Sequence, residues 1–440
     1  MGVRKQDDGF SDENRSNTVK KRAKIVDRPQ GKDGKSYATI TGTYWGFTLT
    51  DGALRMLVLL HFHDLGFSPV DLAFMFLLYE AMGIFTNFIA GWIGAKHGLK
   101  LTLFTGLMVQ IGVLIMLSGV QPHWALGISV IYVMTAQAFS GVAKDLTKMS
   151  AKSAVKRVVP DNNQGLLFRL VALLTGSKNA LKGVGFLLGS VLLQFLGFHV
   201  ALWSMAVFLI LVLLAANGLV TADLGRASQK ITPRDLFSKK REINFLSAAR
   251  VFLFASRDVW FVVGVPISLA SQFGWSFDQI GAFMAAWVIG YGIVQALAPK
   301  LLTHVFDAGS GARAAKLWGT LLCIIPLAMA VGLTPAAMDW WADRPSVELI
   351  LIGGLCLFGI IFAINSSVHS FLIVAYSDRD KVALDVGFYY MANAAGRLLG
   401  TLLSGIVFQF YGLAACLFVS GLMIGLAVLL TLPLGPTSER

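Results

Sequence analysis

Charged residues are scarce in this sequence. Only 14% of its 440 residues are Asp, Glu, Lys or Arg, whereas 55% are hydrophobic. Soluble globular domains carry about 25% charged residues. Acidic residues are the scarcer sign, with 25 against 37 basic ones. This composition excludes an ordinary soluble protein and predicts a polytopic membrane protein.

Cysteine and histidine are also sparse. The three cysteines, Cys323, Cys356 and Cys416, lie in separate apolar segments without paired spacing. That pattern excludes a disulfide framework and a zinc site. The seven histidines are scattered, and no acid, base and nucleophile cluster in the sequence. We therefore expect no metal, no cofactor and no enzymatic activity.

A cleavable signal is not evident either. Residues 1–40 are polar and mixed in charge, and the first apolar run is not followed by a small-residue cleavage site. We expect these residues to form a disordered cytoplasmic tail.

Long apolar runs fill the rest of the chain. About 20 apolar residues cross the ~30 Å hydrocarbon core as a helix. Twelve such spans are predicted, at about 41–63, 70–93, 101–119, 124–145, 166–197, 200–221, 244–270, 279–299, 314–333, 347–375, 382–411 and 413–433. The sequence thus predicts an all-α membrane protein with six-helix bundles at 41–221 and 244–433, a basic cytoplasmic linker at 222–243 and a short tail at 434–440.

Basic residues mark one side of the membrane. The loops after the even-numbered spans carry Lys or Arg, whereas the alternate loops hold only Arg344. Basic loops stay in the cytoplasm. We expect both termini to be cytoplasmic.

Two short motifs recur in the two bundles. Leu65-Gly-Phe-Ser-Pro69 matches Phe273-Gly-Trp-Ser-Phe277, and Gln194-Phe-Leu-Gly197 matches Gln409-Phe-Tyr-Gly412. The offsets, 208 and 215, agree within a loop difference, as expected of duplicated transporter halves. The offset of 215 aligns Lys182 with Arg397 in the sequence. The offset of 208, with a one-residue slip, aligns Asp51 with Asp258.

The first span carries an acid and a base in its middle. Asp51 and Arg55 are four residues apart, so they share a helix face and can neutralise each other. A charge at this depth costs about 2.5–3.5 kcal/mol on insertion scales, which makes it a functional hypothesis by default.

Bases outnumber acids at membrane depth, which favours an anionic substrate. We expect substrate contacts from Arg55, Arg257, Lys182, Arg397 and Lys178. Arg suits a bidentate grip on an oxyanion. The expected coupling or ion-pairing acids are Asp51, Glu80 and Asp258. Two alternatives stay open: Lys178 and Arg250 snorkel to water near the helix ends, and Arg257 forms only a structural pair with Asp258.

Residues 91–100, between the second and third spans, form a basic stretch punctuated by glycine. It resembles the signature loop of the major facilitator superfamily, except that Ala95 stands where that family usually has Asp. The resemblance implies a gating loop containing Gly91, Lys96, Gly98 and Lys100. In organophosphate exchangers of that superfamily, helices 1 and 7 each supply one Arg, which implies a grip formed by Arg55 and Arg257.

Longer stretches carry a narrower resemblance. From about residue 44 to 432 the chain is similar to the ArsJ family of organoarsenical efflux permeases, notably at residues 44–57, 141–153, 175–186, 255–263 and 287–295. The resemblance implies export of an arsenate ester of phosphoglycerate across the bacterial inner membrane. It also implies a functional link to glyceraldehyde-3-phosphate dehydrogenase, which makes that ester.

The sequence thus predicts a transporter that works by alternating access, with proton coupling as an option, as a monomer and without nucleic acid. One alternative is a general organophosphate or organic-anion carrier. Another is a membrane sensor that does not transport.

Overall fold

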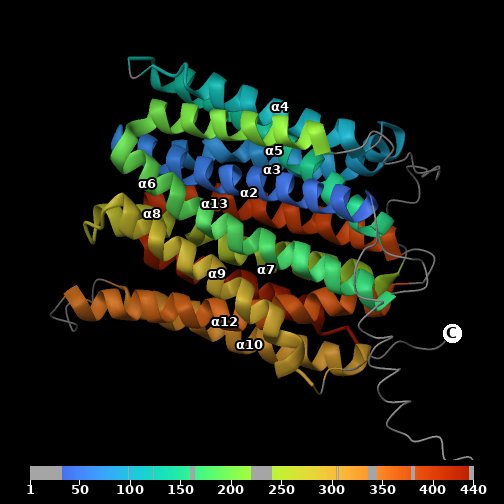
Figure 1. Ribbon diagram of the computed structural model, residues 1–440. Coiled ribbons are helices and arrows are strands. Elements are labelled where there is room, and N and C mark those ends of the chain that lie inside the picture. Colours follow the sequence, from blue (N-terminus) through green and yellow to red (C-terminus); the bar gives the residue numbers. More distant parts are fainter. Residues whose placement is uncertain are drawn as a thin grey trace, which may run out of the picture.

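The computed structural model describes residues 32–97, 99–121, 123–158, 164–219, 240–303, 305, 307–334, 344–377 and 382–435. Within these ranges it is helical and contains no strand, so the all-α prediction is confirmed. The helices are α2 (Lys32–Asp64), α3 (Pro69–His97), α4 (Leu99–Leu117), α5 (Leu126–Val158), α6 (Gln164–Leu219), α7 (Arg241–Phe261), α8 (Gly264–Ser271), α9 (Phe277–Leu301), α10 (Ala308–Gly332), α12 (Arg344–Tyr376) and α13 (Val382–Thr431). Figure 1 shows them running side by side along a common direction.

Nine helices among the described residues are long and apolar enough to cross a membrane. Two of them, α6 and α13, have 56 and 50 residues, and each is broken by one glycine with non-helical backbone angles. When these two are divided and α2 is added, the helices lie at the positions of the twelve predicted spans. The polar α2, which carries Asp51 and Arg55, is not among the nine, so the number of crossings stays a prediction.

The recurring motifs mark equivalent turns in the two halves. Four described residues have a positive φ, and all four are glycines of those motifs: Gly66 at 83°, Gly197 at 74°, Gly274 at 66° and Gly412 at 75°. Only glycine adopts such angles without a steric penalty. The four turns lie at one end of the bundle, where α8 is seen in Figure 1, and we call it the glycine-turn end.

The helices pack in a pattern that repeats between the halves. Helix α6 lies against α2 of its own half and α9 of the other, and α13 lies against α7 and α3 in the same way. A Cβ added at Gly185 would collide with the carbonyl oxygen of Leu49, and one at Gly400 with that of Ala255. Glycine therefore permits the closest helix contacts within each half.

Two glutamines join the halves at the glycine-turn end. Gln409 Oε1 accepts a hydrogen bond from the backbone N–H of Val70 at 3.0 Å, and Gln194 Oε1 accepts one from that of Asp278 at 3.3 Å. Both donors lie in the first turn of a helix, where backbone N–H groups have no partner within the helix.

Some element boundaries differ from the predicted ones. Residues 32–40, expected in the disordered tail, form the start of α2, because Ile40 is buried against residues of α4 and α5. Helix α7 begins at Arg241, inside the predicted linker 222–243. Residues 1–31, 220–239 and 436–440 lie outside the described part of the chain.

Candidate functional site

Arginines from both halves meet at one buried carboxylate. Glu80 on α3 accepts a hydrogen bond from Arg55 Nη1 of α2 at 3.2 Å. Its same oxygen, Oε1, also accepts one from Arg397 Nη2 of α13. The sequence predicted all three as site residues, and the structure brings them into contact.

A second acid continues the cluster into the C-terminal half. Asp258 Oδ1 lies 2.5 Å from Arg257 Nη2, both on α7, and Asp258 Oδ2 lies 3.5 Å from Arg397 Nε. Arg397 thus lies between the two acids. We call Arg55, Glu80, Arg257, Asp258 and Arg397 the central ion cluster.

The central ion cluster lies near half depth. Arg55 is nine residues from the last residue of α2, and Glu80 is eleven residues from the first residue of α3. At 1.5 Å per residue, both lie about 14–17 Å from the glycine-turn end of their helices. A hydrocarbon core of ~30 Å has its midplane at that depth.

Burial differs between the acids and the bases of the cluster. The side chains of Glu80 and Asp258 are 1–2% exposed, whereas those of the three arginines are 11–19% exposed. Two guanidinium nitrogens, Arg55 Nη2 and Arg397 Nε, are buried without a hydrogen-bond partner among the described residues. Arg397 Nε faces Asp258 Oδ2 at 3.5 Å, whereas Arg55 Nη2 has no acceptor within hydrogen-bond distance among the described residues. Because buried donors normally have an acceptor, Arg55 Nη2 is a candidate donor for a substrate oxygen.

Asp51 does not pair with Arg55, although both lie on one face of α2. Asp51 Oδ1 instead accepts a hydrogen bond from the hydroxyl of Tyr79 at 2.6 Å, and Arg55 binds Glu80. The expectation from four-residue spacing was wrong because α3 offers both side chains a partner.

One basic residue near the cluster was missed from the sequence. Lys144 on α5 places Nζ 3.9 Å from the ring centroid of Tyr79 and lies within electrostatic range of Glu80. We predicted a span ending at 145, which put Lys144 at the membrane surface. Helix α5 in fact continues to Val158, so the helix length was the missing signal.

Lys182, which the internal repeat aligns with Arg397, lies near the central ion cluster. This residue of α6 lies within electrostatic range of Arg397, Arg55 and Asp51, and its Nζ is 5.8 Å from the ring centroid of Phe186. Lys178 lies one turn earlier on the same helix and is half-buried.

One alternative held that Arg250 snorkels to water, but the structure buries it. It is 4% exposed, and its guanidinium donates to Asn393 Oδ1 at 3.1 Å and to the carbonyl and hydroxyl oxygens of Ser366 at 3.2 and 3.1 Å. It also lies over the ring of Phe254. Neutral partners on α12 and α13 therefore hold this cation inside the C-terminal half.

The stretch predicted as a gating loop is mostly helical. Gly91 and Lys96 belong to the last turns of α3, Lys100 is the second residue of α4, and Gly98 lies outside the described residues. Lys100 Nζ is 5.3 Å from the ring centroid of Phe104.

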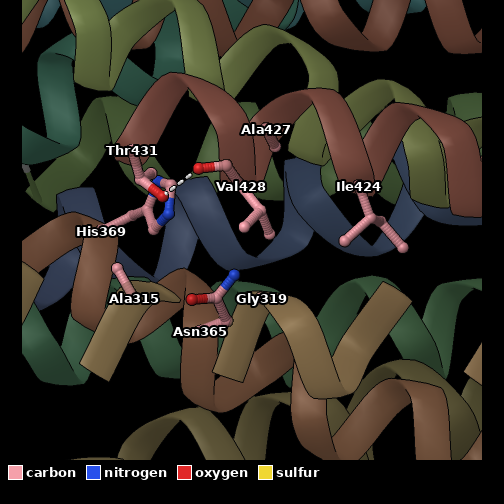
Figure 2. Close-up of a pocket in the computed structure, with 8 residues that line it drawn as sticks. All are labelled: Ala315, Gly319, Asn365, His369, Ile424, Ala427, Val428 and Thr431. Carbon is pink, nitrogen blue, oxygen red and sulfur yellow. Dashed lines mark hydrogen bonds between the residues drawn. The ribbon is translucent and has the colours of Figure 1, made fainter. Parts of the chain in front are cut away.

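A separate small pocket lies between α10, α12 and α13. Figure 2 shows Asn365 and His369 beside apolar residues, with the hydroxyl of Thr431 bonded to the carbonyl of Val428. No member of the central ion cluster lines it. The pocket is not the candidate site.

Comparisons with known proteins agree with this architecture. The family model of the Major Facilitator Superfamily matches residues 40–264 and again 246–440. A crystal structure of the nucleoside transporter NupG is similar, with a TM-score of 0.67 and 16% sequence identity, over 91% of this chain and 98% of that one. No curated protein matches the chain. The chain belongs to the Major Facilitator Superfamily, and it is a multi-pass membrane protein of the transporter class.

Proposed function

We propose that this protein carries a small, multiply charged oxyanion across the membrane by alternating access. The observation that carries the proposal is the central ion cluster, in which arginines of both halves share the Glu80 carboxylate and Arg55 Nη2 has no hydrogen-bond partner among the described residues. Carboxylate, phosphate and arsenate present oxygens that Arg grips in pairs. Binding between the halves is what alternating access requires.

The preferred substrate is an arsenate ester of phosphoglycerate, exported from a bacterial cytoplasm. The similarity to organoarsenical permeases supports it, and so does the cysteine distribution. Trivalent arsenic prefers thiolates, yet Cys323, Cys356 and Cys416 lie on α10, α12 and the last part of α13, outside the central ion cluster. Hard oxygen ligands suit this site better.

A general organophosphate carrier is the second candidate, since the same arginines bind phosphate esters. Counterflow in proteoliposomes with 3-phosphoglycerate, inorganic phosphate and neutral uridine tests the anion class. We expect 3-phosphoglycerate to be exchanged and uridine to be ignored. Exchange of uridine alone would contradict the proposal.

Everted vesicles separate the two candidates. They are supplied with arsenate, glyceraldehyde 3-phosphate and its dehydrogenase with nicotinamide cofactor. Accumulation that needs every component supports the arsenate ester, whereas equal accumulation with phosphate in place of arsenate supports the general carrier.

A further inference from the structure

The carboxylate of Glu80 lies where the two halves of the chain meet. It is almost fully buried, and it binds Arg55 from its own half and Arg397 from the other. Asp258 differs, because its closest partner is the adjacent residue Arg257 on the same helix. Glu80 is therefore the acid of the cluster that neutralises bases of both halves at once.

Four other helices each bring a basic side chain whose charge acts on Glu80: Arg55 from α2, Lys144 from α5, Lys182 from α6 and Arg397 from α13. Without Glu80, the acids left near these four bases and Arg257 would be Asp51, which is bonded to Tyr79, Asp258, and Asp145, which already pairs with Lys148. The bases would then clearly exceed the acids in a buried site.

An alternating-access carrier passes through a state that is closed on both sides, whether loaded or empty. Buried cations without counter-charge are costly in such a state. A bound anion supplies the counter-charge in the loaded carrier. In the empty carrier the counter-charge must come from the protein itself.

We infer that, in the empty carrier, the Glu80 carboxylate replaces the substrate anion as the counter-charge to Arg55 and Arg397. A bound oxyanion displaces this carboxylate from Arg55 and Arg397, because two anions on the same guanidinium groups repel each other. When the anion leaves, Glu80 binds the arginines again, and the empty carrier reorients. This inference rests on the proposed function and adds the mode of transport, which is net flux rather than obligatory one-for-one exchange.

The test measures exchange and net efflux of labelled 3-phosphoglycerate from the same proteoliposomes. Exchange is measured with the unlabelled anion outside, and net efflux with none. Glu80→Gln removes the charge and keeps the shape. We expect the ratio of net efflux to exchange to fall about tenfold or more, while exchange reaches half-saturation at a lower anion concentration because the competing carboxylate is absent.

Two controls accompany this variant. Glu80→Asp keeps the charge and should retain net efflux. Asp385→Asn neutralises another buried acid, which lies in the first turn of α13 outside the central ion cluster, and should leave the ratio unchanged. If Glu80→Gln yields no folded protein, Glu80→Ser provides a smaller neutral side chain.

Full net efflux in a neutral Glu80 variant overturns the inference alone, and so does a wild-type protein that only exchanges. A wild-type protein that neither exchanges nor releases 3-phosphoglycerate removes the proposed function and the inference with it.

Discussion

Gln194 of the N-terminal half and Gln409 of the C-terminal half make equivalent hydrogen bonds, each to a helix of the opposite half. Each accepts a hydrogen bond from the first turn of a helix in the other half, α9 for Gln194 and α3 for Gln409. The adjoining helices also lie very close there, since a Cβ at Gly281 would collide with Ser190 and one at Gly405 with Ala73. The halves are thus closed together at the glycine-turn end.

Removing both glutamines should loosen this closure. Each bond caps a helix start, and the loss of such a cap typically costs about 1 kcal/mol. In a background without the native cysteines, Ser190→Cys should react faster with a maleimide when Gln194 and Gln409 are both Ala. Glutamate at both positions keeps the acceptor oxygen and should keep the slow rate. Equal rates in all three proteins would show that the glutamines do not hold the closure.

Arg55→Lys should weaken anion binding about tenfold or more with normal membrane insertion. The charge is kept, but the planar fork that reaches Glu80 and leaves Nη2 free for an oxyanion is lost. The half-saturating concentration of 3-phosphoglycerate in exchange is the measurement. Arg313→Lys, at an exposed position of α10, is the matched control and should behave as wild type. Unchanged affinity in Arg55→Ala would contradict the assignment.

Arg397→Gln and Lys182→Gln should both lower flux while the protein still folds. After loss of Arg397, Glu80 keeps Arg55 and Asp258 keeps Arg257, so neither acid is left without a cation. Flux per folded protein and the detergent melting temperature separate function from folding, with exposed Lys300→Gln as the control. A large fall in melting temperature with normal flux per molecule would assign these residues a structural role.

Gly197→Ala and Gly412→Ala should each destabilise the protein by about 1–3 kcal/mol, because their backbone angles belong to a region that essentially only glycine occupies. Gly290→Ala is the matched control. It lies inside α9 with open space at the Cβ position, so the change should be neutral or stabilising. Melting temperatures in detergent provide the comparison.

Orientation is testable by labelling from outside the cell. Cysteines introduced beside Arg344 should react with an impermeant reagent, and cysteines beside Lys239 should not. This follows from the basic loops, which stay in the cytoplasm. The reverse pattern, or labelling at both places, contradicts the predicted topology.

Local sequence was enough to find the helices, the repeat and most of the charged site. The motif glycines Gly66 and Gly274 could be recognised because a positive φ needs a particular residue type, which recurs in both copies. Arg55, Glu80, Asp258 and Arg397 could be recognised because charge within an apolar run is rare for energetic reasons.

Partner choice could not be predicted in this way. Asp51 binds Tyr79 and not Arg55 because a neighbouring helix, whose rotation the sequence does not specify, presents a better partner. Lys144 was not predicted as a site residue because hydropathy indicates which part of a helix lies in lipid, and α5 continues beyond that part to Val158. The sequence could not decide whether Arg250 is buried or reaches water, because its neutral partners lie more than a hundred residues away in the chain.

The glycine breaks in α6 and α13 have a mechanical consequence. At Gly197 and Gly412 the chain reverses with no loop residue between the two helical segments. Each pair of segments is therefore a helical hairpin joined at a single residue. Because no loop connects its two arms, one arm cannot slide along the other. Whatever force moves the arm that carries Lys182 or Arg397 is transmitted directly to its lipid-facing partner arm.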